Sequence, residues 1–325
     1  MFKESDNKLL FKNLSLDNNF KIIHLNNLEF DFINSNKIKN KISIIRNNKN
    51  YLISGPIFDG SFIIDEMLKS DKNNDSISKI FTNFNSNITL DINKTYIDKN
   101  SFLNNFNGKL IFINNDLVDL NLISNFPDNE KFSLTIKTNE NGEKVTTFFS
   151  GYAEPFVKKY KFIKGFQEGS LDFYSSKKNK ISTSQLKIYD FKLQKLPVLT
   201  KILTLASLQG IADILSGEGI RFTDLEMSFS NKENIMTIEE LYAIGPAISI
   251  LMSGYVEIDE LVSLRGTLVP ATTINKAVSS IPLLGDILVG KKTGEGVFGV
   301  SFKIKGHPKK LKTTVNPIKT LTPRL

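Results

Sequence analysis

The sequence predicts a mainly β protein with a few short helices inserted in its C-terminal half. The 325 residues include 25 Phe, a residue that favours half-buried pleated surfaces. Short segments alternate apolar and polar residues, as in Leu28–Phe32 and Gln185–Leu193, so that one face of each is apolar. Asn-rich turns separate these segments, and no strand-helix-strand alternation is present. The alternating segments and the turns between them predict an antiparallel sheet.

Residues 1–60 read as short strands between Asn-rich turns, followed by a helix at Phe62–Leu68 after the start signal Asp59–Ser61. From 77 to 150 the pattern is strand, turn, strand, with an Asn-Gly hairpin tip at Asn139–Gly142. The strands predicted up to residue 150 are Phe20–Leu25, Leu28–Phe32, Lys41–Ile44, Tyr51–Gly55, Ile88–Ile92, Lys109–Ile113, Leu117–Leu122, Phe132–Lys137 and Val145–Phe149.

Residues 153–164 predict a charged, helical connector. The strongest helical pattern begins at Pro197 and runs past Gly210 to Leu215, and Gly217 or Gly219 can end it. A second helical insert is predicted at Thr272–Leu288. The strands predicted in this half are Ser170–Tyr174, Gln185–Leu193, Met227–Ser230, Ile235–Ile238, Ala247–Met252, Tyr255–Ile258, Gly296–Ile304 and Lys310–Val315.

Composition narrows the class of protein. The net charge is +8, but the lysines are dispersed among Asn and Ile and form no long basic run, so we do not predict nucleic-acid binding. Cys is absent, which removes disulfide and thiol chemistry. No stretch of about 20 apolar residues predicts a membrane-spanning helix, and the N-terminus lacks the apolar core of a secretion signal.

Residues that could carry chemistry are few. His24 and His307 lack the neighbours of a metal site, and no Gly-x-Ser-x-Gly elbow accompanies them. Glu239–Glu240 and Asp259–Glu260 are adjacent carboxylates, which point to opposite sides of a strand. The stretch 290–294 has the wrong order for a phosphate-binding loop, and 294–299 matches Gly-x-Gly-x-x-Gly in the wrong structural context. We therefore predict neither enzymatic activity nor a bound metal or cofactor.

Lys158–Phe162 interleaves basic and aromatic residues without an RNA-binding motif, and is interpreted as a solvated connector.

Four segments of the C-terminal half carry recognisable motifs: Leu186–Leu199, Leu203–Phe222, Ala243–Asn275 and Ile281–Val300, followed by Gly306–Pro308 and Val315–Pro317. In this order they resemble the AsmA-like family of bacterial envelope proteins, relatives of large inter-membrane lipid-transport proteins. The positions that carry the resemblance are structural helix and turn positions: Pro197, Leu203, Ser207, Gly210, Gly219, Phe222, Gly245, Pro246, Gly254, Gly266, Pro270, Asn275, Pro282, Gly285, Gly294, Gly296, Asn316 and Pro317.

The resemblance implies two domains: a β-repeat region at 1–150, interpreted as the end of a longer array, and an AsmA-like C-terminal domain at 151–325. It also implies a curved sheet that forms an open groove or taco-like trough, holding phospholipid acyl chains and helping to pass them between inner and outer membranes. Such a protein would meet membrane surfaces and other envelope proteins in the periplasm, anchored to the inner membrane. The family's anchor and longer repeat region are not in this sequence, so the interpretation requires segments beyond it.

Two alternatives stay open. A scaffold or assembly factor for outer-membrane proteins would have a closed core and would recruit its partner through a sheet edge or the helices. A hydrolase of envelope polymers would need paired carboxylates about 5 to 10 Å apart in a cleft.

Overall fold

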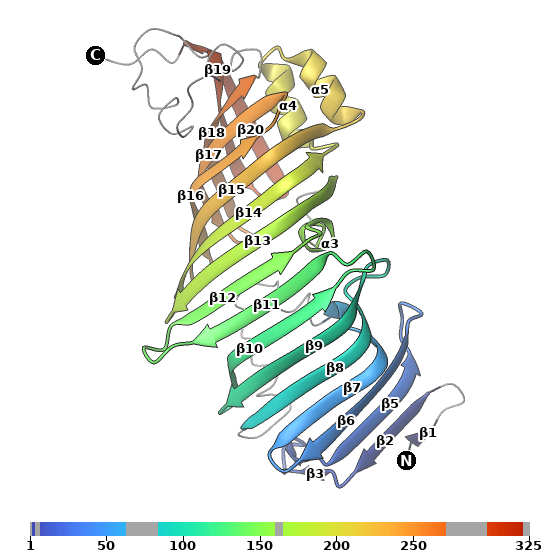
Figure 1. Cartoon of the computed structure of the whole chain (residues 1–325). Helices are drawn as coiled ribbons and strands as arrows, with labels where there is room; N and C mark the ends of the chain where they lie inside the picture. Colours follow the sequence, from blue (N-terminus) through green and yellow to red (C-terminus); the bar gives the residue numbers. More distant parts are fainter. Residues whose placement is uncertain (1, 4–6, 63–83, 160–164, 271–297, 321–325) are drawn as a thin grey trace. The chain divides into compact units, whose positions relative to one another are not determined.

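The computed structural model describes residues 2–3, 7–62, 84–159, 165–270 and 298–320 (Figure 1). The chain forms two compact units. Unit 1 comprises Met1–Gly151 with Ser176–Asn179, and unit 2 comprises Tyr152–Ser175 with Lys180–Leu325. The fold is mainly β, and the described helices are short and belong to unit 2. The predicted fold class is confirmed.

Unit 1 is built from strands, of which β2 and β5 to β12 form one sheet in which neighbours in the chain pair with each other. The strands are β1 (Phe2–Lys3), β2 (Lys8–Lys12), β3 (Ser15–Leu16), β4 (Ile22–His24), β5 (Asn27–Ile33), β6 (Lys39–Asn47), β7 (Asn50–Asp59), β8 (Ser86–Tyr96), β9 (Phe102–Ile113), β10 (Asp116–Asn125), β11 (Lys131–Thr138) and β12 (Lys144–Ser150).

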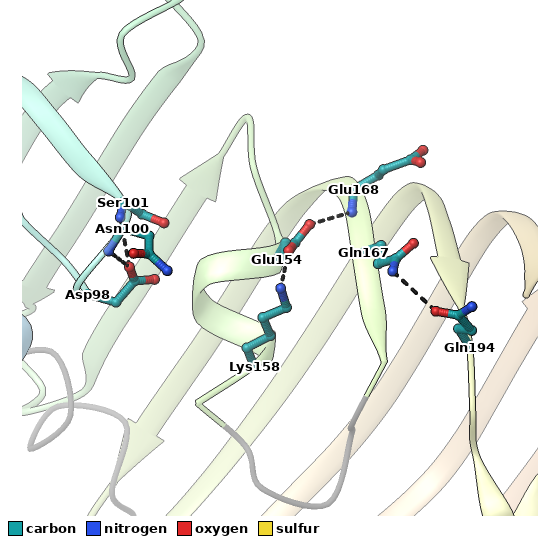
Figure 2. Close-up of polar contacts among 8 residues, drawn as sticks. All are labelled: Asp98, Asn100, Ser101, Glu154, Lys158, Gln167, Glu168 and Gln194. Carbon is teal, nitrogen blue, oxygen red and sulfur yellow. Dashed lines mark hydrogen bonds and ion pairs between the residues drawn. The ribbon is translucent and has the colours of Figure 1, made fainter.

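The turns of unit 1 follow their sequence. Asn48, Asn114 and Asn115 all have positive φ, a conformation that Asn tolerates better than most residues. Between β8 and β9 the carboxylate of Asp98 accepts the backbone N–H groups of Asn100 and Ser101, both at 2.7 Å (Figure 2). The predicted hairpin at Asn139–Gly142 is confirmed, with Gly142 at φ +73°. The turn residues therefore determine where each strand ends.

One pairing in unit 1 contradicts the antiparallel prediction. Strands β7 and β8 run parallel, with Ile53 opposite Leu90. Alternation reveals which residues share a face, but not the direction in which a neighbouring strand runs. The connection between the two strands, 60–85, is long enough for the crossover that a parallel pair needs. The predicted helix at Phe62–Leu68 lies outside the described residues except for Phe62.

Unit 2 is a meander that begins with α3 (Glu154–Val157) and continues with two long strands and two helices. From β14 to β20 every neighbouring pair is antiparallel. The elements are β13 (Phe166–Lys178), β14 (Ile181–Leu193), α4 (Pro197–Leu205), α5 (Gln209–Ser216), β15 (Ile220–Lys232), β16 (Ile235–Ile244), β17 (Ile248–Glu257), β18 (Leu261–Pro270), β19 (Phe298–His307) and β20 (Lys310–Thr320).

The sheet of unit 2 is curved. Helix α4 directly follows β14, yet it also contacts β20, the last strand of the meander. Figure 1 shows α4 and α5 at the end of the sheet where β15 and β17 begin. The two helices therefore cover one end of a bent sheet.

The single helix predicted from Pro197 to Leu215 is wrong, because the structure breaks it in two. Ser207 has φ +60°, and its N–H donates to the carbonyl of Thr204, which closes α4. The break lets α5 turn back on α4, so that Leu203 and Leu215 are both fully buried. Helical periodicity continues through this point, and only packing shows the break.

Two strands predicted at Ala247–Met252 and Tyr255–Ile258 are one strand, β17, and Leu261–Pro270 is a strand that we did not predict. Gly254 does not end β17. It has φ +143°, and a Cβ there would lie 2.2 Å from the carbonyl oxygen of Ser263 in β18. Gly254 therefore lies where the backbones of β17 and β18 approach each other closely.

Replacing this glycine should destabilise the protein. We expect Gly254→Ala to lower the free energy of unfolding by about 1 to 3 kcal/mol, because a side chain is strained there and collides with the neighbouring backbone. Gly210→Ala is the control, because a Cβ at Gly210 meets nothing within 4 Å and lies in a helix, so it should be neutral or stabilising. Urea unfolding of the two variants measures the difference. An unfolding free energy of the Gly254→Ala protein equal to that of the unsubstituted protein would contradict the prediction.

A carboxylate of helix α3 contacts β13. Glu154 accepts the backbone N–H of Glu168 at 3.0 Å and forms an ion pair with Lys158 (Figure 2). Nearby, the side-chain amides of Gln167 and Gln194 link β13 to the segment after β14 at 3.4 Å. Burial by itself raises the pKa of Glu154, but the hydrogen bonds from Lys158 and Glu168 outweigh it and hold the pKa below its ordinary range.

This carboxylate should make stability depend on pH. A folded-state pKa below the unfolded value of about 4.3 contributes stability at higher pH, and that contribution disappears as the pH falls through the folded-state pKa. Glu154→Gln should therefore lower the unfolding free energy at pH 7 by on the order of 1 kcal/mol or less, and by nothing in acid. Glu168→Gln, which removes the half-exposed ion pair with Arg221, is the control and should have little effect at either pH. Equal losses for Glu154→Gln at pH 7 and in acid would disprove this role.

Candidate binding surface

Strand register gathers apolar side chains on one face of the unit 2 sheet. Paired residues lie side by side on the same face, so the pairings can be followed from strand to strand. One such row crosses seven strands, from β14 to β20, and every member is apolar: Leu186, Met227, Leu241, Met252, Gly266, Phe302 and Val315. We call the side of the sheet that carries this row the apolar face of unit 2.

The neighbouring row on the opposite side of the same strands is mostly polar. It begins with Lys187, Glu226 and Tyr242 and ends with Thr267, Ser301 and Asn316, with Leu251 between. Lys187 and Glu226 form an ion pair at 3.2 Å, and the Tyr242 hydroxyl donates to Glu226. Burial, and then the bond to Glu226, raise the pKa of Tyr242, so its hydroxyl stays protonated. The sheet therefore has one apolar and one polar side.

Unit 1 has an apolar face of the same kind. Its central row crosses nine strands, and the parallel pair does not interrupt it, because Ile53 and Leu90 are partners. The row is Phe11, Leu28, Ile44, Ile53, Leu90, Gly108, Leu122, Leu134 and Phe148. We call the side that carries it the apolar face of unit 1. Beside the row, the rings of Phe106 and Phe132 lie 6.2 Å apart.

The apolar faces are only partly shielded from water. In unit 1, Leu28, Ile44, Ile53 and Leu90 are half-buried and Phe11 is 41% exposed, while Leu122 and Leu134 are buried. In unit 2, Leu186, Met227, Leu241, Met252 and Val315 are half-buried, while Phe302 is buried. A closed core would bury such residues almost completely. Large apolar side chains in partial contact with water are available to a ligand.

The end of unit 2 beside the helices is different, because it is a closed core. The rings of Phe166, Phe191 and Phe222 form a stack across β13, β14 and β15, with 5.3 Å between successive centroids. All three are at most 2% exposed. Leu203 of α4 and Leu215 of α5 are fully buried at the same end. This stack stabilises the fold and leaves no room for a ligand.

The two environments should respond differently to truncation. Phe191→Ala removes a fully buried ring and should lower the unfolding free energy by about 3 to 5 kcal/mol. Phe229 lies on the apolar face beside Ile238, and its ring is half-buried. Phe229→Ala should therefore lower the unfolding free energy by less than half as much as Phe191→Ala. Chemical denaturation of both variants tests this, and an equally large loss at Phe229 would show that the apolar face is core.

Several of the predicted family positions meet at the closed end of unit 2. Pro197 begins α4, Leu203 is buried in it, and Ser207 ends it. Gly219 precedes β15 with φ +91°, and Phe222 follows it in the ring stack. The remaining described positions are Gly210 in α5, Gly245 and exposed Pro246 in the β16–β17 turn, Gly254 in β17, Gly266 and buried Pro270 in β18, and Asn316 and Pro317 in β20.

Gly245 belongs to the same group, because a Cβ there would lie 3.2 Å from the ring of Phe222. Gly266 does not: it lies on the apolar face, where the ring of Phe302 covers it. The predicted positions Asn275, Pro282, Gly285, Gly294 and Gly296 lie outside the described residues, as do the predicted helix at Thr272–Leu288 and the stretch 290–294.

The residues weighed for catalysis do not converge where they are described. His24 contacts Arg46, and the Nδ1 atom of His307 accepts the N–H of Lys309 at 3.2 Å. Glu240 is paired with Ser228, and Glu239 sits in the adjoining register shift. Asp259 lies in the turn between β17 and β18 with φ +63°. Within the described ranges no group of three His, Cys, Asp or Glu side chains could hold a metal ion.

Two surface depressions of the described part of the chain lack paired carboxylates. The first runs along α4 and is lined by Lys195, Lys201 and three hydroxyl side chains. The second is lined by residues of β16, β17 and β18, with Glu239 as its one carboxylate. None of the described helices is both long and apolar enough to cross a membrane.

Sequence reasoning missed the most informative residues of the apolar faces. Met227, Met236 and Met252 lie on the apolar face of unit 2, with Met227 and Met252 on either side of Leu241. The available signal was period-2 alternation within each strand, but only the register shows which strands are neighbours. No family model, curated protein or solved structure matches this chain. The AsmA-like resemblance therefore stays a prediction.

Proposed function

We propose that this protein is a non-enzymatic binding protein that holds phospholipid acyl chains against its apolar faces and passes lipids between bacterial inner and outer membranes. The observation that carries the proposal is the row of residues without a polar member in each unit, across nine strands in unit 1 and seven in unit 2.

The dimensions of these rows suit a lipid. Neighbouring strands are about 4.8 Å apart, so seven strands span roughly 30 Å, similar to the hydrocarbon core of a bilayer. An acyl chain laid along such a row gains about 0.8 kcal/mol for each methylene removed from water. No directional bond is needed, and a mixture of chain lengths would be accepted.

The chemistry of the apolar face of unit 2 also supports a fluid ligand. Met227, Met236 and Met252 have flexible, polarisable side chains, which adapt to ligands of variable shape. Leu186 and Leu241, on either side of Met227, are branched and stiffer. The face combines a rigid backbone with side chains that can rearrange around a lipid.

The cellular setting is part of the same proposal. Transfer of lipid between two membranes places the protein in the periplasm, anchored to the inner membrane through a segment beyond this sequence. This location follows from the AsmA-like resemblance, and the apolar faces are compatible with it. The reaction requires no catalytic residue, metal or cofactor, since lipid exchange breaks no covalent bond.

Site-specific photocrosslinking tests lipid contact. We expect p-benzoylphenylalanine at Leu90 to form lipid adducts on irradiation in cells, because this position lies in the centre of the apolar face of unit 1. The same probe at Thr89, the preceding residue of β8, lies on the other side of the sheet and should give none. Met252 and Ser253 of β17 form the equivalent pair in unit 2. Mass spectrometry identifies the adducts.

The outcomes separate the proposal from its alternatives. Absence of lipid at Leu90 and Met252, or equal lipid capture at the paired control positions, would reject it. Adducts with a protein at Leu90 would favour a scaffold for outer-membrane proteins. That second candidate has one observation in its favour: within the described residues, β1 covers only Lys8 and Leu9 on the outer edge of β2, which leaves an edge that another strand could join.

A further inference from the structure

The structure assigns a second site to unit 1: the β3–β4 hairpin is a tip that inserts into the interface of a bilayer containing anionic lipids. The hairpin forms a small sheet of its own, separate from the main sheet of the unit. It carries large apolar side chains that are exposed: Leu14 at 37%, Leu16 at 44%, Phe20 at 84% and Ile23 at 59%. So many exposed apolar side chains in one short ribbon mark an interaction site.

The turn of the hairpin holds Phe20 in its exposed position. The Asp17 carboxylate accepts the N–H groups of Asn19 and Lys21, both at 2.8 Å, and the Asp17 carbonyl accepts the N–H of Phe20 at 3.0 Å. Phe20 itself has φ +61°, a conformation that is uncommon for a bulky residue. A defined, strained turn therefore presents an aromatic ring to the surroundings.

The arrangement of the apolar residues favours a bilayer over a protein partner. Leu16 is paired with Ile22, and the register shift beside them leaves Ile23 unmatched and pointing to the other side of the ribbon. Apolar groups therefore occur on both sides. A folded partner covers one side of such a ribbon, whereas the acyl chains at a membrane interface can surround both.

Charge around the hairpin agrees with an anionic lipid surface. Lys12 precedes the hairpin and Lys21 follows its turn, while Asp17, the one acidic residue from 13 to 26, is bonded to two backbone amides. Basic residues beside an inserted apolar group are attracted to anionic headgroups.

Phe11, the first residue of the central row of unit 1, lies two residues before Asn13, where the hairpin segment begins. A lipid leaving the membrane at the tip would meet the apolar face next; this consequence rests on the proposed function, but the docking itself does not.

A single tryptophan can report insertion, because the chain contains none. The Phe20→Trp protein should show a blue shift of its emission on addition of vesicles of phosphatidylcholine and phosphatidylglycerol, with a smaller shift on phosphatidylcholine alone or in high salt. Ile123→Trp is the matched control, since Ile123 is also exposed, at 57%, but lies in β10. Its emission should not change.

A conservative variant separates insertion from folding. Phe20→Asn removes the ring, yet Asn is tolerated at positive φ, so the turn should be as stable as before. Binding of the Phe20→Asn protein to the same vesicles in sedimentation should fall about tenfold. No blue shift for Phe20→Trp, or unchanged binding for Phe20→Asn, would overturn the assignment. A blue shift that appears without vesicles when the protein concentration is raised would instead show that a second copy of the chain covers the hairpin. Lipid adducts at Leu90 without vesicle binding would reject the tip and leave the proposed function standing.

Discussion

Cross-strand register is the constraint on which this structure depends. Side chains alternate between the two sides of a strand, so a slip of one residue would move each apolar residue of the row to the polar side. In unit 2 the row from Leu186 to Val315 passes six pairings without a polar member, although register shifts occur in the β15–β16, β16–β17 and β19–β20 pairings. The shift beside Glu239 takes up an extra residue, so that Ile238 and Leu241 stay on the same face.

The helices and the ring stack stabilise the fold, whereas the apolar faces are proposed to bind lipid. A curved sheet with an apolar side must cover some of that side in order to be stable. In unit 2 the stack of Phe166, Phe191 and Phe222, with α4 and α5, provides a dense core at one end of the sheet. Stability from this core allows the side chains around Met227 to remain half-buried. Separation of a stabilising core from a binding surface suits a protein whose ligand is itself apolar.

The proposed lipid contacts and the proposed membrane tip use the same physical force in two geometries. On the apolar faces, side chains are aligned by the sheet and can cover the length of an acyl chain. On the β3–β4 hairpin, Phe20 and Ile23 project from a narrow ribbon into the surroundings. Neither site needs a catalytic group, which agrees with the dispersed positions of the described His, Glu and Asp side chains that were weighed for catalysis. Water exclusion is common to both sites, and at the hairpin Lys12 and Lys21 add attraction to anionic headgroups.

The sequence by itself determined the class of fold, most strands and the turns, because alternation and Asn or Gly positions are local properties of the chain. It predicted β5, β6 and β14, the Asn139–Gly142 hairpin and the position of Pro197 at the start of a helix. It did not determine the parallel pairing of β7 with β8, the break at Ser207 or the continuity of β17 through Gly254, because each depends on a partner distant in sequence. The apolar rows likewise became visible only with the register, since the sequence shows which residues share a face of one strand but not which strands lie beside it.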